Sequence, residues 1–502
     1  MSSSPWSSFL NTVQIKRDYS SKPHGLGWRS NKLFIVTAVG LALFTDLFLY
    51  ALLVPVLPFM LADRVGIPPE QIQASISNLL AAYSGASVLI SPIAGVITDR
   101  IGTRRAPFLV GVTALIGATV LLMLGRAIPV LLLARSLQGV SASFVWTTGM
   151  ALCLETVGAE NLGKAIGGIF GFISVGTLLA PMLGGVLYDK GGLGGVFGLA
   201  FALLVLDFIM RVLVIEVKVA RRYEAIHEHA TASKTSQQQN TTLEHEEGEA
   251  HDETTSLLPR VESSLENEYK IPDNLPNILR IMAILPCLAS PRLIVALTIS
   301  FVQAVLLSSI DATVPIIARE SYGFSSLQAG LLFLPIGIAN LTFGPLLGYC
   351  VDKFGTKRVA VLVYLYLVPV LIALGLGVVV QEPGSGPSSS APDVARYAAL
   401  LALVGIGTAG MGAPSVVEAS TVVGKYHAAN PGFFGEDGPY AQLYSLSFLF
   451  FSLGLAVGPE VAGRLRVGVG YGWMNALLAG VCAITAVVCF FLIGERRVMK
   501  NI

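Results

Sequence analysis

Two carboxylates stand inside long apolar stretches of this chain, and they are the residues best placed to do chemistry. Asp46 lies between LALFT and LFLY, and Asp311 lies in SSIDATVP. An ionised carboxylate inside a membrane helix is costly and persists only where it faces a polar cavity or a partner. A desolvated carboxylate can take up and release a proton near neutral pH, which is the elementary step of proton-coupled exchange. We therefore expect Asp46 and Asp311 to bind a proton or a cation, with a structural ion pair as the alternative.

Other charges also fall within apolar sequence. Arg135 lies in LLLARSLQGVSAS, where its charge needs an acidic or carbonyl partner and Gly139 leaves room for a neighbouring helix. Glu418, in PSVVEAST, is expected at midmembrane depth. Asp207 and Arg211 are four residues apart, so they are expected to neutralise each other rather than to take part in transport.

A polar motif is repeated in the two halves of the chain. PIAGVITDRIGTRR, over 92–105, returns as PLLGYCVDKFGTKR, over 345–358, and both copies follow long apolar stretches. Each copy places an Asp, several bases and a Gly where an apolar helix ends, which predicts a short polar hairpin between two membrane helices. The chain is therefore expected to be internally duplicated, and a duplicated membrane protein is first of all a transporter candidate.

A second repeat links two later stretches. GTLLAPMLGG, with Gly176 and Pro181, matches GLAVGPEVAG, with Gly458 and Pro459. Small residues let helix backbones approach closely, and a proline frees a carbonyl and can bend a helix. Plain helix packing and a role in coupling both remain open for these four residues.

The composition excludes several classes of protein. The chain has 502 residues, of which 53% are hydrophobic and 13% are charged, and its mean hydropathy is +0.69. Soluble domains carry about 25% charged residues, so this chain is expected to lie in lipid. A net charge of +1 with scattered bases gives no support for nucleic-acid binding. The five cysteines lack metal-ligand spacing, and no catalytic set emerges, so we expect neither a metal site nor an enzyme.

Apolar stretches long enough to cross a bilayer predict an all-α membrane protein with twelve transmembrane helices in two pseudo-symmetric six-helix bundles. The crossings are expected near 33–61, 76–98, 107–125, 129–151, 164–188, 194–215, 292–318, 327–350, 358–380, 395–423, 440–463 and 470–493. The domains are then a tail over 1–32, bundles over 33–216 and 292–494, a disordered linker over 217–291 and a tail over 495–502.

The bases predict the orientation of the chain. Lys and Arg gather before the first crossing and in the connections that hold the two repeats, which places both termini in the cytoplasm. The linker contains ETTSLL, from Glu253 to Leu258, which resembles an acidic dileucine signal read by a sorting adaptor. Chance occurrence in an acidic linker is the alternative. The resident membrane is expected to be the plasma membrane or a vacuolar or vesicular membrane.

The hairpin repeat, RSLQG at Arg135 to Gly139 and the Gly-Pro helix together resemble the major facilitator superfamily, especially its drug:proton antiporter branch. The resemblance implies that the hairpins latch the two halves in one access state. The residues concerned are Asp99, Arg100 and Arg104 in the first copy and Asp352, Lys353 and Arg358 in the second. A carboxylate beside a helix amino terminus and an Arg gives a charge-assisted contact that rocking would break. A simple role in fixing topology is the alternative.

TDLFLYALLVPVLPFML, over 45–61, and IDATVPIIARESYGFSSLQAGLLFLP, over 310–335, look like the vesicular amine transporters within that branch. This resemblance implies that Asp46 and Asp311 bind a cationic substrate or a proton, and that Arg135 belongs to the coupling machinery or anchors its helix. The chain departs from that group. It has Ala413 and Phe448 where the group has acidic residues, and Tyr83 where the group has Lys, which puts an amine substrate in doubt.

The function that we expect is proton-coupled antiport, in which alternating access exports or sequesters a small organic molecule such as a drug, an amine or a secondary metabolite. A facilitator or proton symporter for a nutrient and a non-transporting receptor remain alternatives, because the fold alone does not fix the function. No cofactor is expected, since the chain lacks a phosphate-cradling loop for ATP. The partners are then protons, a small-molecule substrate and the lipid bilayer.

Overall fold

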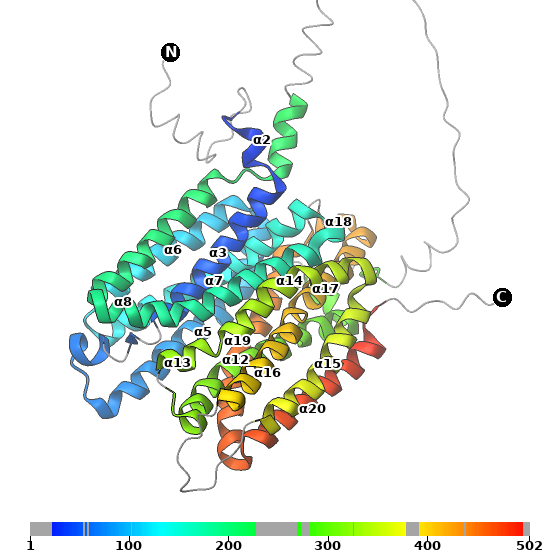
Figure 1. Ribbon diagram of the computed structural model, residues 1–502. Coiled ribbons are helices and arrows are strands. Elements are labelled where there is room, and N and C mark those ends of the chain that lie inside the picture. The colour runs from blue at the N-terminus through cyan, green and yellow to red at the C-terminus, as the bar shows by residue number, and fades with distance from the viewer. Residues whose placement is uncertain are drawn as a thin grey trace, which may run out of the picture.

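The computed structural model describes residues 23–53, 56, 57, 60–101, 103–226, 269–272, 279, 281–324, 326–377, 391–435 and 438–494. Within these ranges every regular element is helical. Figure 1 shows a first group of helices in blue to green, here the N-half, beside a second group in yellow-green to red, here the C-half.

Five long helices build the N-half. They are α3 (Lys32–Leu53), α5 (Pro69–Arg100), α6 (Arg105–Leu124), α7 (Ile128–Val157) and α8 (Leu162–Leu213), with the short elements α2 (Leu26–Arg29), η1 (Met60–Val65) and η2 (Ala159–Asn161). α8 has 52 residues and leaves helical geometry at Gly192, where φ is 58° and ψ is −155°. A helix needs about 20 residues to cross a bilayer, so α8 makes two crossings joined at Gly192.

The C-half repeats this plan. Its elements are η3 (Leu285–Ala289), α12 (Pro291–Tyr322), α13 (Ser326–Leu331), α14 (Leu334–Phe354), α15 (Thr356–Gly377), α16 (Ala391–Ala409), α17 (Gly412–Ala429), α18 (Pro431–Phe434), α19 (Tyr440–Val469) and α20 (Tyr471–Leu492). α16 and α17 together form one apolar span. The described residues hold 11 spans long and apolar enough to cross a membrane. Because α8 crosses twice, the two halves supply the twelve crossings predicted from the sequence.

The expected linker over 217–291 is shorter than predicted. Residues 217–226 are helical, and Tyr223 is buried in a small apolar cluster with Leu26 of α2 and Ile215. At the other boundary, Cys287 of η3 is buried in the core. These apolar side chains pack, so both boundaries move inward. The predicted sorting motif at Glu253–Leu258, residues 1–22 of the predicted tail over 1–32, and the predicted tail over 495–502 lie outside the described residues.

The halves meet along a contact surface that we call the seam, where α8 packs on α14 and α5 packs on α19. A Cβ added to Gly167 of α8 would collide with the backbone carbonyl of Gly344 on α14, and the reverse also holds. Only glycine allows two backbones to come this close. The polar hairpins lie at one end of the seam, which we call the hairpin end.

A methyl group at Gly167 should therefore keep the halves apart. Overpacking of this kind costs about 1–3 kcal/mol, so Gly167→Ala should weaken closure at the hairpin end and slow transport by about tenfold or more. Gly185→Ala is the matched control, because Gly185 lies on the same helix and an added Cβ there meets nothing within 4 Å. Flux in proteoliposomes would measure both variants, and equal losses would contradict the close contact.

Candidate functional site

Asp46 and Tyr83 form the centre of a polar cluster in the N-half. Asp46 on α3 is 2% exposed, so it does not face lipid. Tyr83 on α5 donates its hydroxyl to Asp46 Oδ2 over 3.4 Å, a long hydrogen bond. The other carboxylate oxygen, Oδ1, has no hydrogen-bond partner in the described part of the chain. The Asp46 carboxylate therefore keeps an open acceptor position inside the protein.

Arg135 lies in the same region on α7 and is fully buried. Its Nη1 donates to Gln138 Oε1 over 3.0 Å, while Nε and Nη2 find no acceptor among the residues described. A Cβ added to Gly139 would collide with the carbonyl of Tyr83, so this glycine lets α7 approach α5. The RSLQG motif thus supplies three parts of the cluster. Arg135 is the buried cation, Gln138 is its hydrogen-bond acceptor, and Gly139 allows α5 with Tyr83 to approach α7.

Tyr50 completes the cluster, and the sequence analysis missed it. Its ring centroid lies 4.6 Å from that of Tyr83 and 5.5 Å from Cζ of Arg135, so the ring supports the guanidinium by a cation–π contact. The phenol is within electrostatic range of both Arg135 and Asp311. Tyr50 stands four residues after Asp46, on the same face of α3, and this spacing was the available signal.

Asp311 lies across the seam on α12. Its helix is packed by α17, α19 and α20, yet the carboxylate itself is exposed. The electrostatic interaction with Tyr50 places Asp311 on the side of α12 that faces the N-half. The two carboxylates therefore belong to opposite halves, and Tyr50, four residues after Asp46, is in electrostatic range of Asp311 and contacts Arg135 with its ring.

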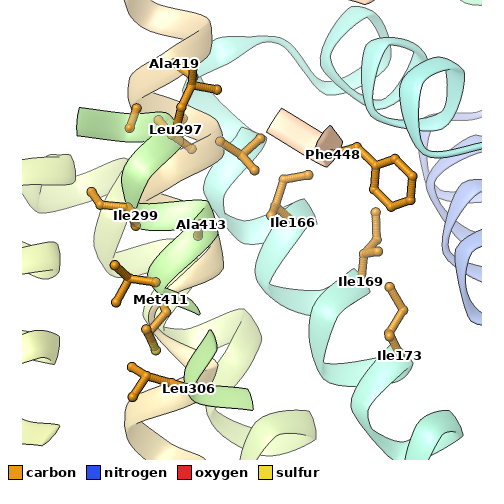
Figure 2. Packing of buried hydrophobic residues seen from close by; sticks show 14 of the residues in the cluster. Ile166, Ile169, Ile173, Leu297, Ile299, Leu306, Met411, Ala413, Ala419 and Phe448 are labelled. Atoms are coloured by element: carbon orange, nitrogen blue, oxygen red, sulfur yellow. The ribbon is translucent and has the colours of Figure 1, made fainter. Parts of the chain in front are cut away.

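Aromatic rings close the seam between this cluster and the hairpin end. Trp146 of α7 stacks on Phe448 and Phe451 of α19, with ring centroids 5.2 Å and 5.8 Å apart, and Phe170 of α8 lies 5.8 Å from Trp146. Figure 2 shows Phe448 beside Ile169 of α8. We call these four rings the aromatic plug. It lies about 16 Å along α7 from Arg135, given a rise of about 1.5 Å per residue.

The two positions that are acidic in the amine transporters hold apolar residues here, and the structure places both residues in apolar surroundings. Phe448 is buried in the plug, and Ala413 packs in the core of the C-half (Figure 2). Tyr444 is also buried, so the aromatic residues of the eleventh crossing belong largely to the interior. Phe450 is partly exposed.

Glu418 does not lie at midmembrane depth, and that expectation is corrected. Its carboxylate accepts bonds from Arg292 Nη2 at 2.7 Å and Nε at 2.9 Å, and from the hydroxyl of Thr356. Arg292 and Thr356 stand at the hairpin-end starts of α12 and α15. Glu418 is therefore satisfied by a buried ion pair away from the seam cluster, and it holds three helices of the C-half together.

The two hairpin carboxylates, Asp99 and Asp352, make equivalent contacts between the halves. Asp99 accepts bonds from the backbone N–H groups of Ala441 and Gln442 at 3.0 Å, and these are the second and third residues of α19. Asp352 accepts bonds from Gly163 at 2.8 Å and Lys164 at 2.9 Å, the second and third residues of α8. Each carboxylate thus caps the amino terminus of a helix in the opposite half.

The predicted hairpin bases differ from one another. Arg104 Nη1 pairs with Asp99 at 3.1 Å, and its Nε pairs with Glu155 at 2.9 Å. Arg100, Lys353 and Arg358 are exposed instead. Of the six hairpin residues predicted to latch the halves, Asp99 and Asp352 make the contacts across the seam and Arg104 supports Asp99.

The comparisons with known proteins agree with this architecture. The family model described as Major Facilitator Superfamily matches residues 39–434. The chain belongs to the major facilitator superfamily. Members of this family are secondary transporters and not enzymes, so the chain is a multi-pass membrane transporter.

The relatives extend over nearly the whole chain. The "MFS-type transporter ppzB" of Metarhizium rileyi is 42% identical over 483 residues, covering 95% of this chain and 98% of that protein. The "Uncharacterized MFS-type transporter C18.02" of Schizosaccharomyces pombe is 36% identical, covering 89% and 93%. The "Synaptic vesicular amine transporter" of Bos taurus is 22% identical, covering 84% and 66%. This last similarity is distant and supports the resemblance stated from the sequence.

Solved structures show the same fold. The human organic anion transporter MFSD10 gives a TM-score of 0.61 at 18% identity, covering 91% of this chain and 99% of that one. The proton:xylose symporter XylE gives a TM-score of 0.65 at 15% identity, covering 92% and 96%. At these identities the likeness shows the major facilitator fold alone.

The Gly-Pro repeat lies where this fold places the helices that carry the site. A Cβ added to Gly176 would collide with the ring of Phe44, two residues before Asp46, and one added to Gly458 would collide with the hydroxyl of Ser308, three residues before Asp311. α8 and α19 remain helical through Pro181 and Pro459. The glycines therefore pack against α3 and α12 close to the two carboxylates.

Asp207 and Arg211 form an internal pair, as expected. Both side chains are fully buried, with Arg211 Nη2 2.6 Å from Asp207 Oδ2, and Arg211 Nη1 also donates to the carbonyl of Phe108 over 2.8 Å. The pair is within electrostatic range of Asp46. Within the described residues no group of His, Cys, Asp or Glu could hold a metal ion.

The aromatic ring of Tyr50, rather than its hydroxyl, should be the part of the side chain that transport requires, because the ring makes the contact with Arg135. A desolvated cation–π contact contributes about 2 kcal/mol, so Tyr50→Leu should lower substrate flux by about tenfold or more. Tyr50→Phe keeps the ring and should retain most of the flux. Initial rates in proteoliposomes compare the two variants, and equal loss in both would exclude the ring as the support of Arg135.

The two hairpin carboxylates should differ in strength, because Asp99 also holds Arg104. A hydrogen bond to a charged group contributes about 1.5–3 kcal/mol, so Asp99→Asn should open the hairpin end more than Asp352→Asn. Spin labels at Glu160 and Arg358, which are exposed at the hairpin end of opposite halves, would report the separation. Asp189→Asn removes an exposed charge remote from both hairpins and is the control. An equal opening by all three variants would contradict the latch.

Proposed function

We propose that this transporter exchanges protons for a small organic molecule, which it exports or sequesters by alternating access. The observation that carries the proposal is the position of Asp46 and Asp311 in opposite halves, with Tyr50 in electrostatic range of Asp311 and in contact with Arg135. Groups that face each other across a moving contact surface change partners whenever the halves rock, and this links binding to movement.

The conformation of the structure, which is closed at the hairpin end, supports a mechanism of alternating access. The hairpin end is closed by two capped helix termini and by the aromatic plug, whereas Asp311 is exposed. A closed hairpin end with an exposed site corresponds to an opening toward the other end of the bundle. The opposite state requires that Asp99 and Asp352 release their helix termini and that Trp146 leaves Phe448.

The chemistry of the cluster supports proton exchange. Asp46 has one oxygen bonded to Tyr83 and one open oxygen, so it can bind a proton or a donor group of a substrate, but not both at full strength. Competition between proton and substrate for one carboxylate is the elementary requirement of antiport. Arg135, whose Nε and Nη2 find no acceptor among the described residues, would stabilise the negative charge of a deprotonated carboxylate.

The substrate class follows from the balance of charge and aromatic surface. The cluster has two carboxylates, Asp46 and Asp311, and one guanidinium, Arg135, so the site favours a ligand with a positive charge or a hydrogen-bond donor. Phe44 and Phe172 stack 4.5 Å apart beside α3 and offer apolar ring surface. The Bos taurus relative is named as a vesicular amine transporter, but the acidic positions of that group are apolar here. An amine, a drug or a secondary metabolite with an apolar ring face fits these conditions.

The resident membrane is proposed to be the plasma membrane or a vacuolar or vesicular membrane, with both termini in the cytoplasm. The concentration of Lys and Arg at the hairpin end supports this orientation. A sorting adaptor that reads Glu253–Leu258 belongs to the same proposal.

Transport in proteoliposomes with an imposed pH gradient tests the proposal. A panel of cationic and neutral ring compounds should show saturable uptake into vesicles with an acidic interior, and collapse of the gradient should abolish accumulation. Asp46→Asn should stop gradient-driven uptake, because it removes the group for which proton and substrate compete. Asp189→Asn, an exposed charge away from the seam, should leave uptake unchanged.

Two other results would replace the proposal. If the compound equilibrates across the membrane at a rate independent of the pH gradient, the protein is a facilitator. If uptake follows the direction of proton flow, it is a symporter. An absence of flux for every compound, with signalling unaffected by Asp46→Asn, indicates a receptor on the transporter fold.

A further inference from the structure

The end of the long central segment is docked on the C-half. Tyr269 is 7% exposed, and its ring meets that of Tyr426 edge-on at 5.1 Å. Lys425 Nζ lies 5.8 Å from the centre of the Tyr269 ring, and the phenol interacts with Arg292. A tyrosine in a polar connecting segment is expected to remain in water, so its burial among these residues identifies a specific contact.

Asn430 holds the backbone of this segment with both atoms of its side-chain amide. Its Nδ2 donates to the carbonyl of Tyr269 over 2.8 Å, and its Oδ1 accepts from the N–H of Ile271 over 2.9 Å. A primary amide that donates and accepts in this way imitates the paired N–H and C=O of a β-strand neighbour. Asn430 also ends α17 and begins α18, so the docked segment is fixed to a helix junction.

A second tie reaches the amino terminus of α19. The N–H of Ile284 donates to Oε1 of Gln442 over 3.3 Å. The backbone N–H of the same Gln442 donates to Asp99 of the N-half over 3.0 Å. Residues 269–272 and Ile284, which together we call the strap, are therefore bonded to the two ends of the α17–α19 connection. One of these ends receives the latch of the opposite half.

We propose that the strap is a built-in restraint that holds the start of α19 where Asp99 can cap it. Docking of Tyr269 on Asn430 stabilises the hairpin-closed state, and release of the strap frees α19 and favours opening of the hairpin end. The central segment thereby controls the access state through its last residues. The restraint adds to the proposed exchange and does not depend on the identity of the substrate.

Accessibility of a cysteine at the closed seam tests the restraint. Ser445 on α19 is buried, its hydroxyl occupies the space beside Gly95 of α5, and Ser445→Cys is nearly isosteric. A membrane-impermeant thiol reagent should modify Cys at position 445 only when the hairpin end opens. Peptide mass spectrometry on the full-length chain measures the rate at that position separately from the five native cysteines.

Tyr269→Ala and Asn430→Ala should each raise the rate by about tenfold, which corresponds to about 1.4 kcal/mol in the opening equilibrium. Tyr269→Phe keeps the ring against Tyr426 and the backbone bonds to Asn430, so its rate should stay near that of the parent. Asn475→Ala removes a buried amide of α20, bonded to the carbonyl of Tyr471 and remote from the strap, and is the control for general loosening of the C-half.

Unchanged rates in both alanine variants would overturn the proposal. A rise in Asn475→Ala equal to that in Asn430→Ala would overturn it as well, because the effect would then be one of stability. The measurement needs no substrate, so it stands or falls independently of the proposed proton exchange.

Discussion

The structure depends on two carboxylates that cap helices belonging to the other half of the molecule. The first turn of any helix leaves N–H groups without intrahelical partners, and a partial positive charge gathers there. Asp99 satisfies α19 and Asp352 satisfies α8, in each case at the second and third residues of the helix. These bonds exist only while the halves touch at the hairpin end, so they keep that end closed. The position of the aromatic plug and the exposure of Asp311 belong to this closed state.

The repeated motif nevertheless produces two unequal contacts. Asp99 is supported by Arg104, which is itself held by Glu155, whereas Lys357, at the position equivalent to Arg104, lies 5.0 Å from the ring of Phe490. The backbone contacts also differ, because a Cβ at Gly348, the equivalent of Gly95, would meet first the carbonyl of Gly163, whereas one at Gly95 would meet first the hydroxyl of Ser445. One seam contact is therefore polar and braced, and the other is a close approach of two backbones. Duplication conserved the scaffold and allowed the energetics of the two contacts to diverge.

Features that depend on repeated motifs or on charges within apolar stretches could be predicted from the sequence. Features that depend on contacts between helices could not. Asp46 and the hairpins could be found because a charge in an apolar stretch, or a motif written twice, is visible in one chain. For Tyr50 the only signal in the sequence was its spacing of four residues from Asp46, and its contacts with Tyr83 and Arg135 form where α3, α5 and α7 meet. Glu418 was placed at the wrong depth because its partners, Arg292 and Thr356, stand at the starts of other helices, and the sequence of its own crossing does not show them. Nothing in the composition of the central segment marked Tyr269 as buried.

The two carboxylates occupy unequal environments, and under the proposed exchange this inequality gives them different roles. Asp311 is exposed in the hairpin-closed state, so it meets an arriving proton or ligand first. Asp46 is buried against Tyr83 and within electrostatic range of the buried Arg211, so a change in its charge acts on its neighbours with little screening by water. Tyr50 lies in electrostatic range of Asp311 and against Arg135, and therefore carries the effect of binding at α12 to the N-half. Coupling in such a site needs no third carboxylate, because Asp46 and Asp311 belong to opposite halves, and Tyr50, which is in electrostatic range of Asp311, also contacts Arg135.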